Sequence, residues 1–372
     1  MHRFARVGYR SAMIATPPPT LVEVLRGSTV ESRHRGAVAV AAPDGRPAAA
    51  VGDPTLPVTL RSGVKPLAIA ALGPAGAIDA FALSDEELAL MASSHSGSDR
   101  AVEIQRRLLE RLGIARDVLR NPPSLPSDEE ARARLIVTGD GPGVLRHMCS
   151  GFHLASVVLS LYAGWPLEGY LDAGHPSQRA AREIVVATFG EPIDESIDDC
   201  GLPTWTCRLE QIARGYAFLA NPEAAAAEGR LEPALARALA RIRDAMVREP
   251  ELIAGPDQTS TLLIRAAAGR LVAKEGAEGL LGIGVSCGGG NRGTGALDAF
   301  GPVGGVAITI EDGDRMRRAT PIVAIEALRQ LGVLAEPLPA SLEARRRPVS
   351  QDGLGRAVGE ALPVFRLEPA GA

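Results

Sequence analysis

Short apolar runs at both ends of the chain enclose a middle section in which apolar residues recur every three or four positions. The short runs are typical of strands and the periodic section is typical of helices. Predicted strands span Leu21–Leu25, Ala37–Ala42, Leu262–Ile264, Arg270–Ala273 and Val306–Ile310. The first two are expected to pair antiparallel. This order predicts an α+β fold, in which an antiparallel sheet built from N- and C-terminal strands is flanked by helices and a helical subdomain is inserted.

Helix signals are clearest where a capping residue precedes the periodic pattern. Ser84 and Glu87 form a capping box that opens a helix running into Met91. Pro66 falls in the first turn of another predicted helix, where proline is tolerated. The other predicted helices are Gly63–Leu72, Asp99–Leu112, Gly151–Ala163, Ser177–Phe189, Leu209–Leu219, Glu232–Val247 and Thr320–Leu331, the last ending at Gly332.

The same pattern divides the chain into three parts. Residues 1–20, which end in a proline-rich segment, are predicted to be a flexible lead-in. Residues 21–335 form one folded domain whose helical subdomain covers about 98–250. Residues 336–372, with an arginine run at 344–348, are expected to be a solvated C-terminal tail.

Composition excludes several classes of function. The 372 residues carry a net charge of −4 and only 3% aromatic residues, so neither a phosphate-neutralising surface nor a base-stacking platform is expected, and nucleic acid is not a predicted partner. The most apolar stretch, Leu154–Leu171, is interrupted by polar residues, which argues against a membrane span. Four cysteines and no apolar leader point to the cytoplasm.

The glycine-rich run 282–295 has one alternative interpretation as a phosphate-binding loop. It lacks the Gly-Lys-Ser/Thr ending of such loops, so the spacing alone is weak support. A mobile loop beside a site is the preferred interpretation.

Lysine usage gives the strongest chemical signal. Of the 40 lysines and arginines, only Lys65 and Lys274 are lysine. Arginine stays protonated in proteins, whereas a desolvated lysine can lose its proton and act as a base. Lys65 stands three residues after Ser62, which on a helix places both side chains on one face within hydrogen-bonding reach. Such a Ser-x-x-Lys pair activates the serine nucleophile of penicillin-recognising enzymes.

The second lysine extends this pattern. Lys274 ends a predicted strand and is followed by Glu275 and Gly276, similar to the Lys-x-Gly strand of the same enzymes. Between the two lysines in sequence lies a hydroxyl-rich loop with Ser94. A second serine that relays a proton is presented at this place in such enzymes.

Several motifs in the same order resemble the L-asparaginase II family. The resemblance covers about residues 21–333 and implies a serine β-lactamase-like fold, a homodimer and hydrolysis of L-asparagine to L-aspartate and ammonia through a seryl acyl-enzyme. The motifs are Val22–Gly36, Arg61–Pro66, Ser94–Gly97, Cys149–His153, His175–Gln178, Asp198–Pro203 and Gly269–Gly279.

The resemblance implies two Ser-Lys pairs. Ser62 with Lys65 matches the first pair and Ser94 with Lys274 the second. Ser62 is the predicted nucleophile and Lys65 its general base, while Ser94 and Lys274 relay protons; which serine attacks first stays open. The candidate residues for binding the small amino-acid amide substrate are Arg61, His95 and Asp198.

Departures from the family affect metal and substrate binding. The resemblance implies a zinc site built from two cysteines and a lysine; the cysteines match Cys149 and Cys200, but Phe152 replaces the lysine and has no donor atom. The chemistry requires no cofactor, and Zn²⁺ is an alternative to two buried reduced cysteines. The family segment Gly-Arg-Phe-Asp-Thr appears here as residues 257–261, without its Arg and Asp.

These departures leave alternatives to an asparaginase open. A related Ser-Lys hydrolase of another small amide would explain Phe152 and Ser260 at positions where polar groups are expected. A catalytically silent relative that binds a small molecule would not explain why both lysines are kept.

Overall fold

The computed structural model describes residues 17–287, 300–314 and 317–370. In these residues a nine-stranded sheet has the order β10-β11-β1-β2-β9-β8-β7, with β3 paired to β2 and β12 paired to β3. Every pairing is antiparallel. Its strands are β1 (Thr20–Arg26), β2 (Thr29–Ala41), β3 (Pro47–Val51), β7 (Leu271–Glu275), β8 (Leu281–Val285), β9 (Gly305–Ile310), β10 (Val349–Gln351), β11 (Ala357–Pro363) and β12 (Glu368–Pro369).

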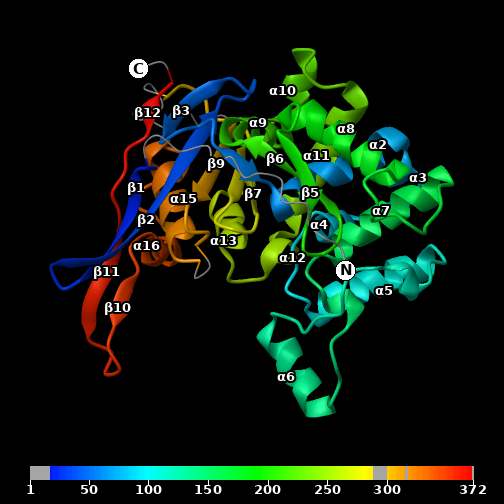
Figure 1. The fold of residues 1–372 in the computed structure, drawn as a ribbon, viewed down its shortest axis with the longest axis horizontal. Helices are drawn as coiled ribbons and strands as arrows, with labels where there is room; N and C mark the ends of the chain where they lie inside the picture. Colours follow the sequence, from blue (N-terminus) through cyan, green and yellow to red (C-terminus); the bar gives the residue numbers. More distant parts are fainter. Residues whose placement is uncertain (1–16, 288–299, 315–316, 371–372) are drawn as a thin grey trace, which may run out of the picture.

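Strands from the two ends of the chain lie side by side, as the order of elements predicts. β1 pairs with β2, and β2 pairs with β9, Val38 lying opposite Ile308. Figure 1 shows the blue N-terminal strands next to the red C-terminal ones. The predicted α+β fold with an antiparallel sheet from both chain ends, flanked by helices, is therefore confirmed.

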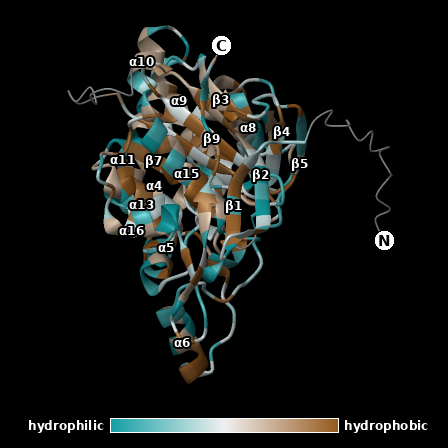
Figure 2. Ribbon diagram, turned by 90° about the vertical axis from the view of Figure 1, so that its left-hand side faces the viewer, coloured by the Kyte–Doolittle hydropathy of each residue, from teal (hydrophilic) through white to brown (hydrophobic). Residues whose placement is uncertain are grey.

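Helices cover the sheet and form most of the middle of the chain. The α-helices in the described ranges are α1 (Lys65–Ala68), α2 (Leu72–Ala75), α3 (Ala77–Ala80), α4 (Asp85–Met91), α5 (Asp99–Arg111), α6 (Glu129–Thr138), α7 (Ser150–Ala163), α8 (Pro176–Phe189), α9 (Leu209–Ala220), α10 (Pro222–Ala227), α11 (Pro233–Arg248), α12 (Pro250–Ala254), α13 (Thr259–Ala266), α15 (Ala319–Gln330) and α16 (Ala340–Arg346). The 3₁₀ turns are η1 (Arg61–Val64), η2 (Ile69–Ala71), η3 (Arg116–Val118) and η4 (Val144–Arg146). Apolar residues concentrate in the body of the molecule, and α6 projects from it (Figure 2).

Helix α9 packs directly on the sheet because glycines leave room for it. α9 contacts β2, β8 and β9. A Cβ on Gly282 of β8 would lie 2.0 Å from Cε2 of Tyr216, and one on Gly305 of β9 would lie 2.0 Å from the Ala213 carbonyl oxygen. The start of the glycine-rich run is thus a packing surface within β8, and residues 288–295 of that run lie outside the described residues.

A small second sheet positions the turn that carries Ser62. β4 (Pro57–Thr59), β6 (Pro203–Arg208) and β5 (Asp194–Ile197) pair in the order β4-β6-β5. The Leu60 N–H continues this pairing by donating to the Trp205 carbonyl at 2.8 Å. The turn that carries Ser62 follows directly, so β6 fixes where that turn begins.

Two expectations about secondary structure need correction. Residues 262–264 are not a strand but part of α13; a three-residue apolar run fits either element, and the neighbouring buried Thr259 and Thr261 extend its buried face at helical spacing. The predicted helix over 63–72 is a series of short turns, η1, α1, η2 and α2. Pro66 does lie in the first turn of α1.

The C-terminal segment is also not a solvated tail. β11 pairs with β1 at the edge of the main sheet, Glu23 lying opposite Leu362, and β12 pairs with β3. Phe365 and Leu367 are buried in the core. Short strands that complete an existing sheet edge need little apolar patterning of their own, which is why the sequence pattern did not reveal them. The predicted lead-in falls mostly on residues 1–16, outside the described residues.

Candidate active site

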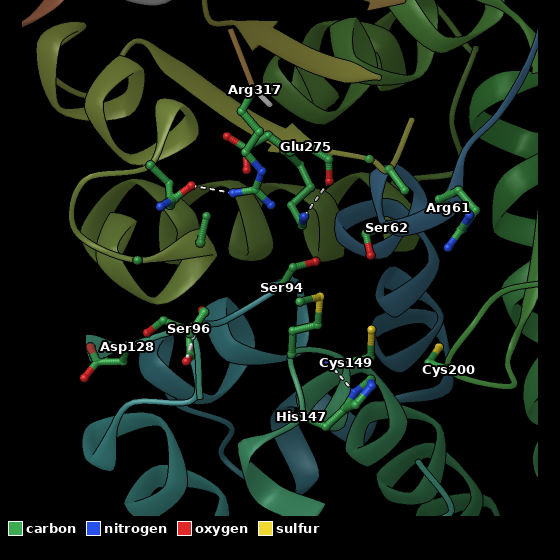
Figure 3. Close-up of a pocket in the computed structure, with 18 of the residues that line it drawn as sticks. Arg61, Ser62, Ser94, Ser96, Asp128, His147, Cys149, Cys200, Glu275 and Arg317 are labelled. Carbon is green, nitrogen blue, oxygen red and sulfur yellow. Dashed lines mark hydrogen bonds between the residues drawn. The ribbon is translucent and has the colours of Figure 1, made fainter. Parts of the chain in front are cut away.

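A cavity of about 920 Å³ opens where η1, the loop after α4, the N-terminus of α7 and the end of β7 meet. Its walls include Ser62, Ser94, Lys274 and Cys149, which belong to four of the segments singled out in the sequence. Figure 3 shows Ser62 and Ser94 between the wall that carries Glu275 and Arg317 and the wall that carries Cys149 and His147. The structure therefore gathers both predicted serines at one cavity.

The turn at Ser62 is held in a strained shape. Arg61, which precedes it, has φ of +46°, a left-handed conformation that non-glycine residues rarely adopt. The Arg61 N–H donates to Thr204 Oγ1 at 3.0 Å, and the buried Tyr216 hydroxyl donates to the Gly63 carbonyl at 2.7 Å. Bonds on both sides of Ser62 thus support a conformation that is found mostly at functional sites.

Arg61 and Asp198, both predicted to bind substrate, bind each other. Arg61 Nε donates to Asp198 Oδ1, and Arg61 Nη2 donates to Asp199 Oδ2 at 2.6 Å. The guanidinium and Asp198 are largely buried, whereas Asp199 is exposed. Although burial opposes the charge, the two carboxylates raise the pKa of Arg61. All three residues line the cavity, but the Arg61 charge is already engaged there by two carboxylates.

Lys65 is buried and bonded to Ser94 rather than Ser62. Its Nζ donates to the Ser93 carbonyl at 3.0 Å, to Ser94 Oγ at 3.1 Å and to Cys149 Sγ at 3.2 Å. These three acceptors match the three donor hydrogens of an ammonium group. No hydrogen bond joins Lys65 to Ser62 within the described ranges, so the contact expected from their i, i+3 spacing is not made.

Lys274 is buried in β7 beside the serines. It pairs with Gly282 of β8, and its Nζ donates to the Glu275 carbonyl at 2.6 Å. Burial, followed by repulsion from Lys65, lowers the pKa of Lys274 to about 7 from its usual 10.5. Near neutral pH this amine is therefore partly unprotonated and can accept a proton.

The loop after α4 presents Ser94 and Ser96 to the cavity but not His95. The Ser94 N–H donates to the Ile253 carbonyl at 2.9 Å, which fixes the loop against α12. The buried His95 ring accepts from the Gly97 N–H at Nδ1 and contacts Ser150 Oγ through Nε2 at 2.9 Å. Burial and the charge of Lys65 lower the pKa of His95 to about 3, so the ring is neutral. His95 therefore stabilises the loop. It does not line the cavity, so its predicted role in substrate binding needs correction.

Cys149 and Cys200 are buried together beside Lys65. Interaction with the Cys200 thiol lowers the pKa of Cys149, with Lys65 and His147 adding to the effect, and the pKa of Cys200 is raised in turn. The Phe152 ring centroid lies 5.9 Å from Lys65 Nζ, so a cation–π contact occupies the place of the third ligand that the resemblance implies.

The donor set does not fit a zinc ion. In the part of the chain that the structure describes, no group of three or more His, Cys, Asp or Glu side chains is arranged to hold a metal. The neighbouring His153 Nδ1 is 2.8 Å from the Tyr170 hydroxyl. Two thiols, one of them bonded to the Lys65 ammonium, give half of a tetrahedral set. We derive no step through a metal.

Two cavity residues, Glu275 and Arg317, were missed by the sequence analysis. Glu275 directly follows Lys274, so its position in the Lys-x-Gly strand was a usable signal. Arg317 stands in a loop before α15, and no motif marks it. His147, whose Nδ1 accepts from the Cys149 N–H at 3.1 Å, was also missed.

Two solved structures that resemble the chain are titled as crystal structures of Mglu, one in its native form and one in its tris and glutamate form. They share 15% and 16% identity with TM-scores of 0.36 and 0.33; the matches cover 82% and 85% of this chain. The chain spans only 66% and 64% of those proteins. A comparison with curated proteins found no match.

The fold and the cavity define an α+β protein with serines and buried lysines at one site. The model of the L-asparaginase II family matches residues 22–363, nearly the whole chain. The chain belongs to the L-asparaginase II family. None of the helices in the described ranges is long and apolar enough to cross a bilayer.

Proposed function

We propose that the protein hydrolyses the side-chain amide of L-asparagine to L-aspartate and ammonia. The observation that carries this proposal is that Ser62 and Lys274 line the same cavity, the amine being buried with its pKa lowered to about 7. An unprotonated amine beside a serine is the arrangement that Ser-Lys hydrolases need to attack an amide. Family membership supports the reaction class, and the lysine supports the mechanism.

The two lysines have different roles in this proposal. The three hydrogen bonds of Lys65 Nζ all go to protein groups other than Ser62, so this amine is already engaged away from the proposed nucleophile. We therefore assign the base to Lys274 in place of Lys65, and we assign to Lys65 the positioning of Ser94. Ser62, whose hydroxyl has no partner within the described residues, remains the proposed nucleophile.

The proposed reaction proceeds through an acyl-enzyme. Ser62 Oγ attacks the carboxamide carbon while its proton passes to Lys274 Nζ, and the carbonyl oxygen becomes an oxyanion that the Ser62 N–H stabilises. The intermediate collapses as the C–N bond breaks, and the departing nitrogen takes the proton from Lys274 as ammonia. Water then attacks the ester with the same base, releasing L-aspartate and restoring Ser62.

Ammonia release from L-asparagine tests this function. The purified protein is expected to release ammonia and L-aspartate in equal amounts, and Ser62→Ala should lower kcat by at least about 10³-fold. Ser350→Ala, in the distant strand β10, is the matched control and should keep wild-type rates. Undiminished turnover in Ser62→Ala would show that another group attacks the amide.

A larger amide substrate is the second candidate. The cavity volume of about 920 Å³ lies near the upper end of the range for sites that hold drug-sized ligands, well beyond the needs of one small amino acid. An amide panel that includes L-glutamine and asparaginyl dipeptides distinguishes the two candidates. Higher kcat/KM on a dipeptide than on L-asparagine would favour the larger substrate.

We also propose a homodimer, which the resemblance implies, and a cytoplasmic location, which rests on the cysteine usage of the sequence. Sedimentation velocity at several protein concentrations tests the first, and a monomer throughout would contradict it. Fractionation of the producing cells tests the second, and recovery outside the cytoplasm would contradict it.

A further inference from the structure

The charged groups on the cavity wall differ in whether they are already paired. Arg61 is held by two aspartates. Arg317 and Glu275 line the same cavity, and neither takes part in an ion pair within residues 17–287, 300–314 and 317–370. Figure 3 places them together on the wall facing Ser94 and Ser62. Other acids line the cavity, but within the described ranges Arg317 and Glu275 place an unpaired cation and an unpaired anion together on this wall.

Arg317 is aimed by a residue at the position where the family motif has arginine. In the segment 257–261, Gln258 stands where Gly-Arg-Phe-Asp-Thr has Arg. The Gln258 side-chain carbonyl accepts a hydrogen bond from Arg317 Nη1 at 2.5 Å. Backbone geometry adds to this hold, since Arg317 has φ of +50° and its N–H donates to the Asp314 carbonyl at 2.6 Å. Gln258 and the local backbone therefore hold the Arg317 guanidinium at the cavity wall.

Glu275 stands in the same relation to the missing aspartate. Ser260 occupies the position of Asp in the motif. The Ser260 N–H donates to Glu275 Oε1 at 3.2 Å, which leaves Oε2 without a protein partner among the described residues. The Ser260 segment thus holds one oxygen of Glu275, and the other is open to a ligand in the cavity.

We propose that Arg317 and Glu275 form the clamp for a zwitterionic substrate, Arg317 binding its α-carboxylate and Glu275 its α-ammonium group. The inference rests on the proposed function and names the substrate class as free α-amino acids with a side-chain amide. A guanidinium binds a carboxylate through two parallel N–H groups, and a carboxylate accepts from an ammonium. Both contacts orient the amide toward Ser62 without touching the reacting atoms.

Ligands that lack one charge test each half of the clamp. Succinamate is L-asparagine without its amino group, and 3-aminopropanamide is L-asparagine without its carboxylate. Binding to the Ser62→Ala protein is measured by calorimetry, which does not need turnover. Adding Arg317→Ala should weaken L-asparagine and succinamate binding about 10- to 100-fold and leave 3-aminopropanamide unchanged. Adding Glu275→Gln should weaken L-asparagine and 3-aminopropanamide and leave succinamate unchanged.

Conservative and distant variants complete the design. Arg317→Lys should recover part of the lost affinity because it restores the charge without the planar fork. Arg366→Ala and Glu183→Gln, at exposed positions outside the cavity lining, are the matched controls and should bind all three ligands like the parent. In the active enzyme Arg317→Ala should raise KM for L-asparagine 10- to 100-fold and change kcat by less than about threefold.

The outcomes separate the clamp from the proposed reaction. Equal losses for all three ligands, no loss for any of them, or no binding by the parent would overturn the clamp. Ligand-selective losses in a protein that releases no ammonia would uphold the clamp and refute the proposed hydrolysis. Ammonia release that Arg317→Ala and Glu275→Gln leave unchanged would uphold the hydrolysis and refute the clamp.

Discussion

Replacing Lys274 with methionine should strongly lower kcat and at the same time raise the free energy of unfolding. The side chain is fully buried, and its pKa falls to about 7 from 10.5 because burial, and then Lys65, disfavour the ammonium. A folded pKa below the unfolded value means that the native state holds the proton less well than the unfolded chain. Lys274→Met removes this penalty, since methionine fills a similar volume without a charge.

The size of the stability gain in Lys274→Met follows from the lowered pKa of Lys274. Each unit of pKa corresponds to about 1.4 kcal/mol, so a change from 10.5 to about 7 corresponds to at most about 5 kcal/mol. The entropy of unfolding is about 2.1 cal/mol/K per residue, or about 0.8 kcal/mol/K for this 372-residue chain. A stability gain of at most about 5 kcal/mol therefore corresponds to a rise in Tm of at most about 6 °C. Loss of the base should lower kcat by about 10²- to 10⁴-fold.

The stability difference between Lys274→Met and the wild type should depend on pH. Below pH 7 Lys274 is protonated in both states and the penalty is complete. Between pH 7 and 10.5 only the unfolded chain keeps the proton, so wild-type stability rises with pH relative to the variant. The gain in Lys274→Met should therefore shrink from about 4 kcal/mol at pH 7, where the native amine is half deprotonated, to about 2 kcal/mol at pH 9.

Denaturant unfolding at pH 7 and pH 9 measures this gain, with ammonia release measured in parallel. Lys65→Met is the contrasting variant, because it removes three hydrogen bonds and should lower the free energy of unfolding by about 3 kcal/mol or more. A less stable Lys274→Met protein, or a stability difference that does not change with pH, would refute the reasoning.

Three further predictions concern packing, positioning and metal. Gly282→Ala should destabilise the protein by about 3 kcal/mol or more, because its Cβ would lie 2.0 Å from the Tyr216 ring. The control Gly141→Ala places its Cβ in open space and should leave stability unchanged. Equal melting temperatures of the two variants in thermal melts would contradict the packing of α9 on β8. Tyr216→Phe removes the bond to the Gly63 carbonyl and should cost about 1 kcal/mol and lower kcat more than it raises KM; an unchanged kcat would remove Tyr216 from the support of the Ser62 turn. A chelator should leave activity unchanged and metal analysis should find less than one zinc per chain, while loss of activity that zinc restores would contradict the donor set described.

Local signals in the sequence were reliable where one segment decides the outcome. The capping box at Ser84 and Glu87 forms as predicted, with both reciprocal bonds present. The rarity of lysine drew attention to Lys65 and Lys274, both of which are buried; Lys274 lines the cavity, and Lys65 is bonded to the cavity residue Ser94. Capping and residue usage depend on neighbours in sequence, so one chain suffices to recognise them.

Partners supplied by distant segments could not be predicted. The i, i+3 spacing suggested that Lys65 bonds Ser62, but the loop after α4 and the N-terminus of α7 bring Ser94 and Cys149 closer to the amine. Arg317 meets Gln258 across 59 positions of sequence, and no spacing rule covers such a distance. Tertiary packing decides these contacts, and only the folded chain shows them.

The most direct measurement is kcat/KM for ammonia release from L-asparagine between pH 5 and pH 9. With Lys274 as the base, the rate should rise with pH and level off above an inflection near 7, because only the unprotonated amine accepts the proton from Ser62. A profile that is flat through this range, or activity that Lys274→Met retains, would contradict the assignment of Lys274 as the group that activates the serine.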